Sequence, residues 1–164
     1  MPTDPPPRLH TILMDQILLT LQSPNMIGAC GFLANIFSIF AKYGISVDLI
    51  TTSEVSVALT IDYTGSQSSG KSVLSEQLLQ ELKSFCRVRI DEGLSLIALI
   101  GNGMSQVSGT GAAVFSSICD VNIRMICYGA STHNLCFLVN EDQAPKAIAE
   151  LHHKLLEGNP TTIK

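Results

Sequence analysis

Tryptophan is absent from this 164-residue sequence, and aromatic residues make up only 5% of it. Charged residues are also scarce, at 15%, and the formal net charge is −4. Proteins that bind nucleic acid usually carry basic patches, and those that bind single strands add aromatic rings for base stacking. The shortage of both features predicts that nucleic acid is not a partner.

Long apolar runs are missing as well. No run approaches the roughly 20 residues that a membrane-spanning helix needs. The first seven residues, which include three consecutive prolines, do not resemble a signal peptide. We therefore expect no membrane partner and a cytoplasmic location.

Cysteine motifs are also missing. The five cysteines form no CxxC pair, and their odd number argues against a disulfide framework; they are Cys30, Cys86, Cys119, Cys127 and Cys136. Four of them lie in apolar runs and are expected to be buried thiols, which fits a reducing compartment.

Hydrophobic residues make up 46% of the chain, enough for a well-packed core. The stretch from Gly44 to Ile61 shows two alternating apolar patterns separated by a polar break at residues 51–53, which predicts a pair of half-buried strands. Similar patterns predict strands at 10–14, 17–21, 45–50, 55–61, 87–90, 95–100, 123–127 and 134–139, and helices at 29–43, 72–85, 110–119 and 144–156.

The predicted order β-α-β-β-α-β occurs twice. Shifting the sequence by 78 positions aligns identical residues at a strand end, a loop, a helix face and a turn. These pairs are Leu21/Leu99, Met26/Met104, Gly31/Gly109, Ala34/Ala112, Phe37/Phe115, Ser38/Ser116, Ile45/Ile123 and Ser53/Ser131. We therefore expect an α+β fold of two ferredoxin-like βαββαβ domains, each an antiparallel sheet with helices on one face.

The second repeat lacks its last strand, and the N-terminal segment is one strand too many for the first. We expect this segment to cross over and fill the open place. The predicted domains are residues 15–93 and residues 94–158 plus strand 8–14, with residues 1–7 and 159–164 as linkers or tails.

Several motifs resemble the regulatory tandem ACT domains of aspartate kinases, and more closely the lysine-sensitive aspartokinase III group. They are Asn25-Met26, Gly31-Phe32-Leu33, residues 45–57, residues 124–131 and residues 133–139. The Lys-Phe-Gly-Gly signature of the family's catalytic domain is absent, so we expect no catalytic residues and no cofactor in this chain. The resemblance implies a parent kinase that uses Mg-ATP, a contact with its kinase domain, and a homodimer joined through the first ACT domain.

Two acids in the first repeat point to a small diamino ligand. Asp48 lies within a predicted strand and Glu54 beside it, and an acid in such a place is unusual unless a cation meets it. The loop before the first helix offers backbone N–H groups to a carboxylate. The second repeat has Ile126 and Thr132 at the equivalent positions, which predicts one such site in each chain.

The resemblance implies that the ligand is L-lysine and that the chain mediates feedback inhibition of aspartate phosphorylation in lysine, threonine and methionine biosynthesis. Its lysine-binding residues would be Met26, Ala29, Gly31, Phe32, Leu33, Ser46, Val47, Asp48, Ser53 and Glu54. Some relatives are expected to carry a hydroxyl residue where this chain has Ala29. Phe32, Leu33 and Val47 also suit a core role in any such fold, and the acid that meets each ammonium group stays open.

Two other functions compete with lysine sensing. Gly65–Ser72 satisfies the P-loop pattern GxxxxGK[ST] between a predicted strand and a predicted helix, but a P-loop needs a parallel sheet and these strands are paired as hairpins. A dimerisation module without a ligand is the other alternative. Adjacent His152 and His153 point to different sides of a helix, which argues against a metal site.

Overall fold

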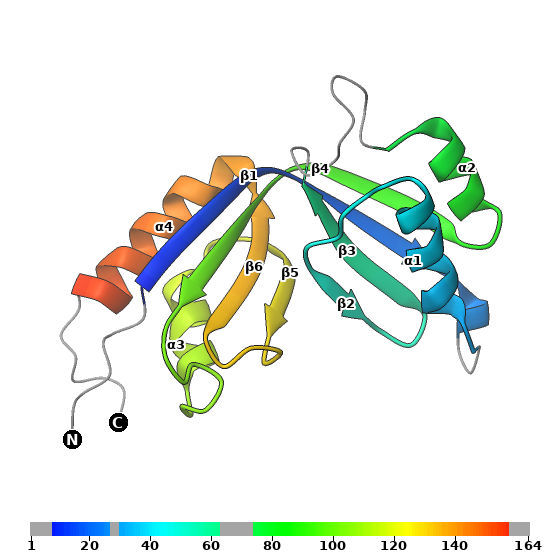
Figure 1. Ribbon diagram of the computed structural model, residues 1–164. Coiled ribbons are helices and arrows are strands. Elements are labelled where there is room, and N and C mark those ends of the chain that lie inside the picture. The colour runs from blue at the N-terminus through cyan, green and yellow to red at the C-terminus, as the bar shows by residue number, and fades with distance from the viewer. Residues whose placement is uncertain (1–7, 27–29, 63–73, 158–164) are drawn as a thin grey trace. The chain divides into compact units, whose positions relative to one another are not determined.

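The computed structural model describes residues 8–26, 30–62 and 74–157 (Figure 1). Its strands are β1 Arg8–Gln22, β2 Ile50–Thr52, β3 Ser56–Asp62, β4 Arg87–Ile100, β5 Ile123–Tyr128 and β6 Asn134–Asn140. Its α-helices are α1 Phe32–Lys42, α2 Glu76–Lys83, α3 Thr110–Ser117 and α4 Ala144–Leu151, and single turns are η1 Pro24–Met26 and η2 Glu141–Gln143. A π-helical turn, η3 His152–Glu157, follows α4 directly.

The strands follow the order β2-β3-β1-β4-β6-β5, and the paired strands β1–β3, β2–β3, β4–β6 and β5–β6 are antiparallel. The chain divides into two compact units. The first unit is residues 15–93, and the described part of the second unit is residues 94–157 with residues 8–14. The predicted fold, an α+β pair of βαββαβ units with antiparallel pairing, is confirmed.

Two long strands replace four predicted short ones. The sequence predicts a break at Asp15-Gln16 and another between residues 90 and 95, but β1 and β4 are continuous and pass from one unit into the other (Figure 1). Asp15 and Gly93, which are 78 positions apart, both have positive φ values of 57° and 68°. Each strand therefore contains one residue outside the extended region of φ and ψ, at the boundary between the two units, and continues beyond it.

The hairpin of the first unit is shifted from its predicted place. The predicted turn residues Thr51 and Thr52 pair with Ala58 and Val57, so the turn lies at residues 53–55. Residues 45–49 were predicted as strand but form no regular ladder. The N–H groups of Asp48 and Leu49 both donate to Thr60, at its carbonyl oxygen and its Oγ1, each at 3.0 Å. Two residues facing one is the pattern of a bulge, which interrupts regular pairing.

Each unit has its own apolar core between its helices and one face of its strands. In the first unit Ile36 and Phe40 of α1 and Leu78 and Leu82 of α2 are buried against alternate residues of β1 and β3. Ser75 caps α2 by accepting a hydrogen bond from the N–H of Leu78 at 3.3 Å. The predicted helix 72–85 is shorter because this cap sets its start. The predicted helices 29–43 and 110–119 are also shorter, as the bounds of α1 and α3 show, whereas α4 and η3 together cover the predicted helix 144–156.

The expectation that four cysteines are buried was wrong. Only Cys86 and Cys136 are buried, whereas Cys30 and Cys119 are exposed and Cys127 is half-buried. Both exposed cysteines lie just outside a helix, Cys30 before α1 and Cys119 after α3, so an apolar neighbourhood in the sequence does not place them in the core.

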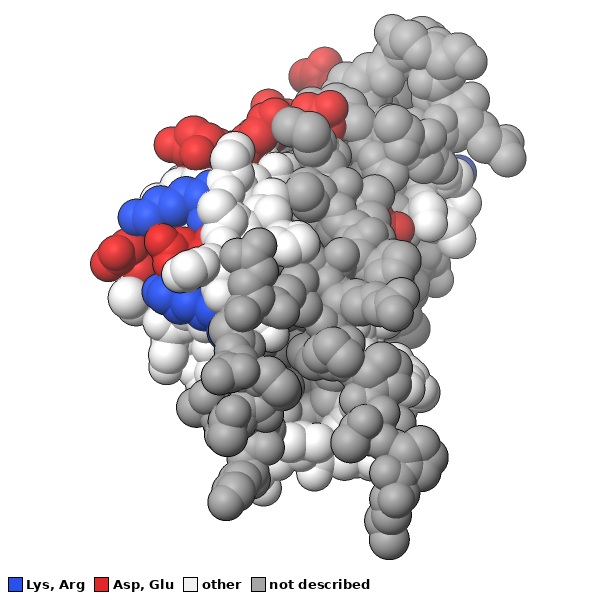
Figure 2. Space-filling model, turned by 90° about the vertical axis from the view of Figure 1, so that its left-hand side faces the viewer, with Lys and Arg blue, Asp and Glu red and all other residues white. Residues whose placement is uncertain are grey.

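Among the described residues, no helix is both long and apolar enough to cross a membrane. On the face drawn in Figure 2, blue basic side chains lie among red acidic ones. Ion pairs in the second unit include Lys154–Glu150 at 2.8 Å and Lys146–Asp120 at 3.8 Å. In these pairs each basic side chain lies beside an acidic one.

Candidate functional site

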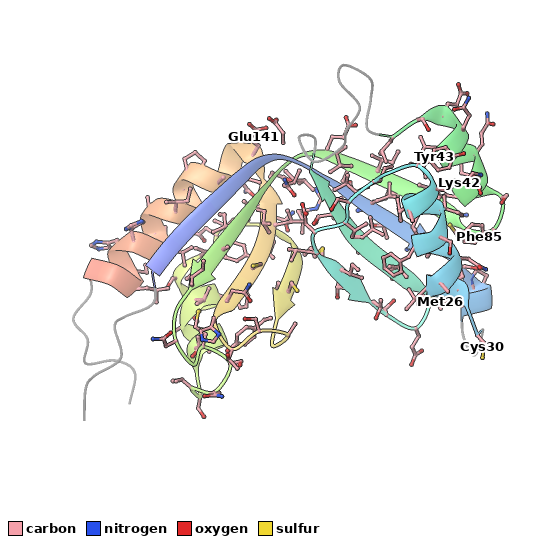
Figure 3. All side chains as sticks on the ribbon, viewed as in Figure 1. Met26, Cys30, Lys42, Tyr43, Phe85 and Glu141 are labelled. Atoms are coloured by element: carbon pink, nitrogen blue, oxygen red, sulfur yellow. The ribbon has the colours of Figure 1, made fainter. Side chains whose placement is uncertain are left out.

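The start of α1 supplies backbone donors. Gly31 precedes the helix with φ 90°, a left-handed conformation that favours glycine, and no side chain caps the helix there. The first N–H groups of α1 therefore have no partner within the helix. Figure 3 places Met26 and Cys30 at this end of α1, and Lys42 and Tyr43 at the other end. The arrangement suits a carboxylate at the start of α1.

Apolar side chains surround this helix start. Phe32 contacts Phe85 edge to face, with ring centroids 5.8 Å apart, and Met26 and Val47 pack against the core of the first unit. Leu33 is 39% exposed, which is high for a large apolar residue. Together these groups provide an apolar wall beside the helix start, as an aliphatic ligand stem requires.

The predicted acids lie on the solvent side of the hairpin. Asp48 and Ser46 are exposed, whereas Val47 between them is partly buried. Glu54 is exposed in the turn, and its neighbour Ser53 is held by two contacts to Ser56, a backbone bond of 2.8 Å and an Oγ–Oγ contact of 2.6 Å. Ala29 lies outside the described residues.

Sequence reasoning missed Thr60, which orients the acid-bearing segment. Thr60 is fully buried, and it binds the backbone of both Asp48 and Leu49. Nothing in the alternation of residues 56–62 distinguishes this threonine from any polar strand residue. Its role follows only from the bulge, which depends on the pairing of two strands.

The two repeats differ at the loop before the first helix. One hydrogen bond occurs in both, from Ser23 N–H to Val55 O at 3.0 Å and from Gly101 N–H to His133 O at 2.9 Å. The hydrogen bond donated by the equivalent methionines Met26 and Met104 differs between the repeats. Met26 N–H donates back to Ser23 O within its own loop at 3.1 Å, whereas Met104 N–H donates across to Thr132 O at 2.8 Å.

Tyr128 adds a second link between the loop and the hairpin of the second unit. Its hydroxyl donates to Met104 O at 2.6 Å, and its ring lies over Gly111, where an added Cβ would stand 3.8 Å away. The equivalent residues of the first unit are Ile50, which is 40% exposed, and Leu33. In the second unit the loop is therefore joined to the hairpin, and Met104 is only 3% exposed. Among the described residues of the first unit, the Met26 N–H bonds to Ser23 O instead, and Ile50 has no hydroxyl to donate.

Tyr128→Phe is expected to lower the free energy of unfolding by about 0.5–1.5 kcal/mol, because it removes one hydrogen bond and leaves the ring in place. Denaturant titration followed by circular dichroism measures this change. Tyr43→Phe is the matched control, because it also removes a tyrosine hydroxyl, but from the first unit. There the Tyr43 hydroxyl donates to Glu81 Oε2 at 3.0 Å. Unchanged stability of the Tyr128 variant would show that the hydroxyl does not hold the loop.

An open hollow of about 870 Å³ also lies in the first unit, but it contains none of the ten predicted residues. Its lining comes from the ends of β1 and α2 and the start of β4, together with Val55. Within the described part of the chain, no group of three or more His, Cys, Asp or Glu side chains is arranged to hold a metal ion. Shape alone therefore does not identify the ligand site.

Comparison with known proteins identifies the fold. The model of the ACT domain family matches residues 19–69 and 97–155. The lysine-sensitive aspartokinase 3 of Escherichia coli is 54% identical over 157 residues, which cover 94% of this chain and 35% of that protein.

Two solved structures of the Escherichia coli aspartokinase III are similar in fold. The complex with aspartate and ADP, called the R-state, matches with a TM-score of 0.84 at 53% identity, over 94% of this chain and 35% of that one. The complex with lysine and aspartate, called the T-state, matches with a TM-score of 0.82 at 52% identity, over 93% of this chain and 34% of that one. The chain thus spans about a third of the length of these relatives.

Proposed function

The chain belongs to the ACT domain family and is homologous to the regulatory region of aspartate kinases, and from this premise we propose that its first unit binds L-lysine. Binding would transmit feedback inhibition to the aspartate kinase domain of a longer cytoplasmic enzyme, which would use Mg-ATP. The observation that carries the proposal is the presence of Asp48 and Glu54 on the first hairpin where the second has Ile126 and Thr132.

The chemistry of lysine fits this difference. Its two ammonium groups each need an anionic or carbonyl oxygen, and charge-assisted hydrogen bonds are the strongest available. Asp48 and Glu54 are exposed acids on one hairpin, the start of α1 offers backbone N–H groups, and Met26, Phe32 and Val47 offer apolar contact. Gly31, Leu33, Ser46 and Ser53 complete the proposed set, with Ala29 at the loop position outside the described residues.

Isothermal titration with lysine, threonine, methionine and Mg-ATP tests the proposal. We expect heat from lysine alone, because threonine and methionine leave one of the two acids without a cation. Heat from Mg-ATP would instead support the P-loop alternative, whose residues Gly65–Ser72 lie outside the described part of the chain. No heat from any ligand would support the dimerisation module without a ligand.

The first unit also has the features of a pairing surface for a second copy. Its outer strand β2 is exposed along its length and lies at one end of the strand order. Leu33, Ile50 and Val55, from α1, β2 and the hairpin turn, are each about 40% exposed. An edge strand with exposed apolar neighbours invites another chain. We propose a homodimer joined through this unit, with lysine at or near the joint.

Lysine is expected to strengthen this dimer, since a ligand that binds the dimer better must also favour its formation. Sedimentation velocity over a dilution series, with and without lysine, measures the dimer dissociation constant in each case. We expect the transition to move to lower protein concentration when lysine is present. A monomer that binds lysine at full strength at every concentration would show that the interface is not part of the site.

A further inference from the structure

Two cysteines of the second unit lie opposite each other on neighbouring strands. Cys127 of the outer strand β5 pairs with Cys136 of β6 in the antiparallel register. Residues directly opposite in such a pair have their Cα atoms about 4.5 or 5.5 Å apart, depending on the hydrogen-bonding position. Both values fall within the roughly 4.4–6.8 Å range that disulfides span. The register therefore brings these two cysteines within bonding reach.

Their side chains also share one face of the strands. Leu135 and Phe137, on either side of Cys136, pack in the core of the second unit, so Cys136 points to the opposite face. Directly opposite residues of an antiparallel pair point the same way, and Cys127 therefore lies on the face of Cys136. The pKa of the Cys136 thiol is raised by burial and, to a smaller extent, by the neighbouring Cys127, which agrees with their proximity.

The two thiols differ in access. Cys136 is only 6% exposed, whereas Cys127 is half-buried on β5, which is the last strand in the order of the described sheet. An oxidant thus reaches Cys127 first, and Cys136 is placed to resolve the product. The other buried thiol, Cys86, donates to Leu82 O at 3.1 Å, and burial raises its pKa to about 11.

We propose that Cys127 and Cys136 form a reversible cross-strand disulfide when the protein meets a peroxide. The Cys127 thiolate attacks one peroxide oxygen, which breaks the O–O bond and gives a sulfenic acid and hydroxide. The Cys136 sulfur then attacks the Cys127 sulfur and expels the sulfenic oxygen as water. Two thiols and one hydrogen peroxide become one disulfide and two waters, and the two electrons go to the peroxide.

The bond is expected to be easily reduced. Directly opposite strand residues hold their Cβ atoms about 4.5–5.5 Å apart, which is at or beyond the roughly 3.5–4.5 Å of relaxed disulfides. Closing this distance strains the strands, and strained disulfides have higher reduction potentials than structural ones. The pair therefore suits a reversible modification that joins the outer strand to its neighbour. It does not depend on lysine binding, because both residues lie in the second unit.

Mass spectrometry of the peroxide-treated chain tests the proposal. No Lys or Arg lies between Met125 and Lys146, so trypsin leaves both cysteines in the peptide 125–146, whose mass falls by two hydrogen atoms when the bond forms. Cleavage by chymotrypsin after Tyr128 separates the two cysteines, and the two pieces stay linked only through the disulfide. Reduced glutathione is expected to release them.

Cys127→Ser and Cys136→Ser are each expected to abolish the linked pieces, whereas Cys30→Ser and Cys119→Ser, at exposed cysteines elsewhere, keep them. Circular dichroism confirms that each variant is folded. A folded, oxidised chain whose two pieces separate without a reductant would overturn the proposal. Linked pieces that resist millimolar glutathione would overturn its reversibility.

Discussion

Replacing Phe137 with alanine is expected to destabilise the second unit by about 3–5 kcal/mol, the range for removing a buried phenylalanine from a packed core. Phe137 lies on β6, is 1% exposed and contacts the ring of Phe115 edge to face, with centroids 6.0 Å apart. The variant removes both this aromatic contact and the packing around it. Denaturant titration followed by circular dichroism measures the loss.

Val107→Ala is the matched control, since Val107 is apolar, lies in the same unit and is 46% exposed. Its effect is expected to stay within about 0.5 kcal/mol. Equal losses in the two variants would contradict the assignment of Phe137 to the core. The equivalent residue of the first unit is Leu59, which is fully buried, and Leu59→Ala is expected to cost about 2–5 kcal/mol.

Asp48→Ala and Glu54→Ala are each expected to weaken lysine binding by about 1.5–3 kcal/mol, the range for a hydrogen bond to a charged group. This corresponds to roughly a 10- to 150-fold rise in the dissociation constant. Isothermal titration measures it. Both acids are exposed, so neither replacement removes core packing. The chain is expected to stay folded while binding falls.

Glu76→Ala serves as the control for charge, because Glu76 is an exposed acid of the same unit at the start of α2. It is expected to leave the lysine dissociation constant unchanged. The conservative variants Asp48→Asn and Glu54→Gln keep the shape of each side chain and remove only its charge. If lysine bound all these variants as it binds the original chain, the site would lie elsewhere.

Titration with norleucine shows which acid contacts which ammonium group of lysine. Norleucine has the stem and the α-ammonium group of lysine but lacks the ε-ammonium group. Replacing the acid that meets the ε-ammonium group is expected to weaken the binding of lysine but not that of norleucine. Replacing the acid that meets the α-ammonium group is expected to weaken the binding of both lysine and norleucine. This comparison shows which of Asp48 and Glu54 meets each ammonium group, which their arrangement leaves open.

Local sequence patterns were sufficient to predict the two units but not to predict where their strands end. The 78-residue repeat predicted two βαββαβ units because apolar periodicity and identical residues recur at the same places. The continuity of β1 and β4 was not predictable in this way. Asp15-Gln16 and residues 91–93 are polar or glycine, which is typical of a turn, yet β1 and β4 continue through them, with positive φ values at Asp15 and Gly93.

The hairpin of the first unit shows the same limit. Thr51 and Thr52 have the composition of a turn, yet they pair with Ala58 and Val57, respectively. The bulge at Thr60 moves the regular pairing along the strand by placing two residues opposite one. A bulge depends on hydrogen bonds between segments 11 residues apart, and no pattern within either segment specifies it.

The sequence by itself determined the α+β class, the two repeats, and the presence of Asp48 and Glu54 in only one of them. Both loops share one hydrogen bond to their hairpins, and the tertiary structure decided which loop gains a further one. Met26 and Met104 are identical residues at equivalent positions, yet one N–H bonds within its own loop and the other bonds across to Thr132. Partner choice depends on distances between distant segments, and in the second unit Tyr128 and Gly111 bring those segments together.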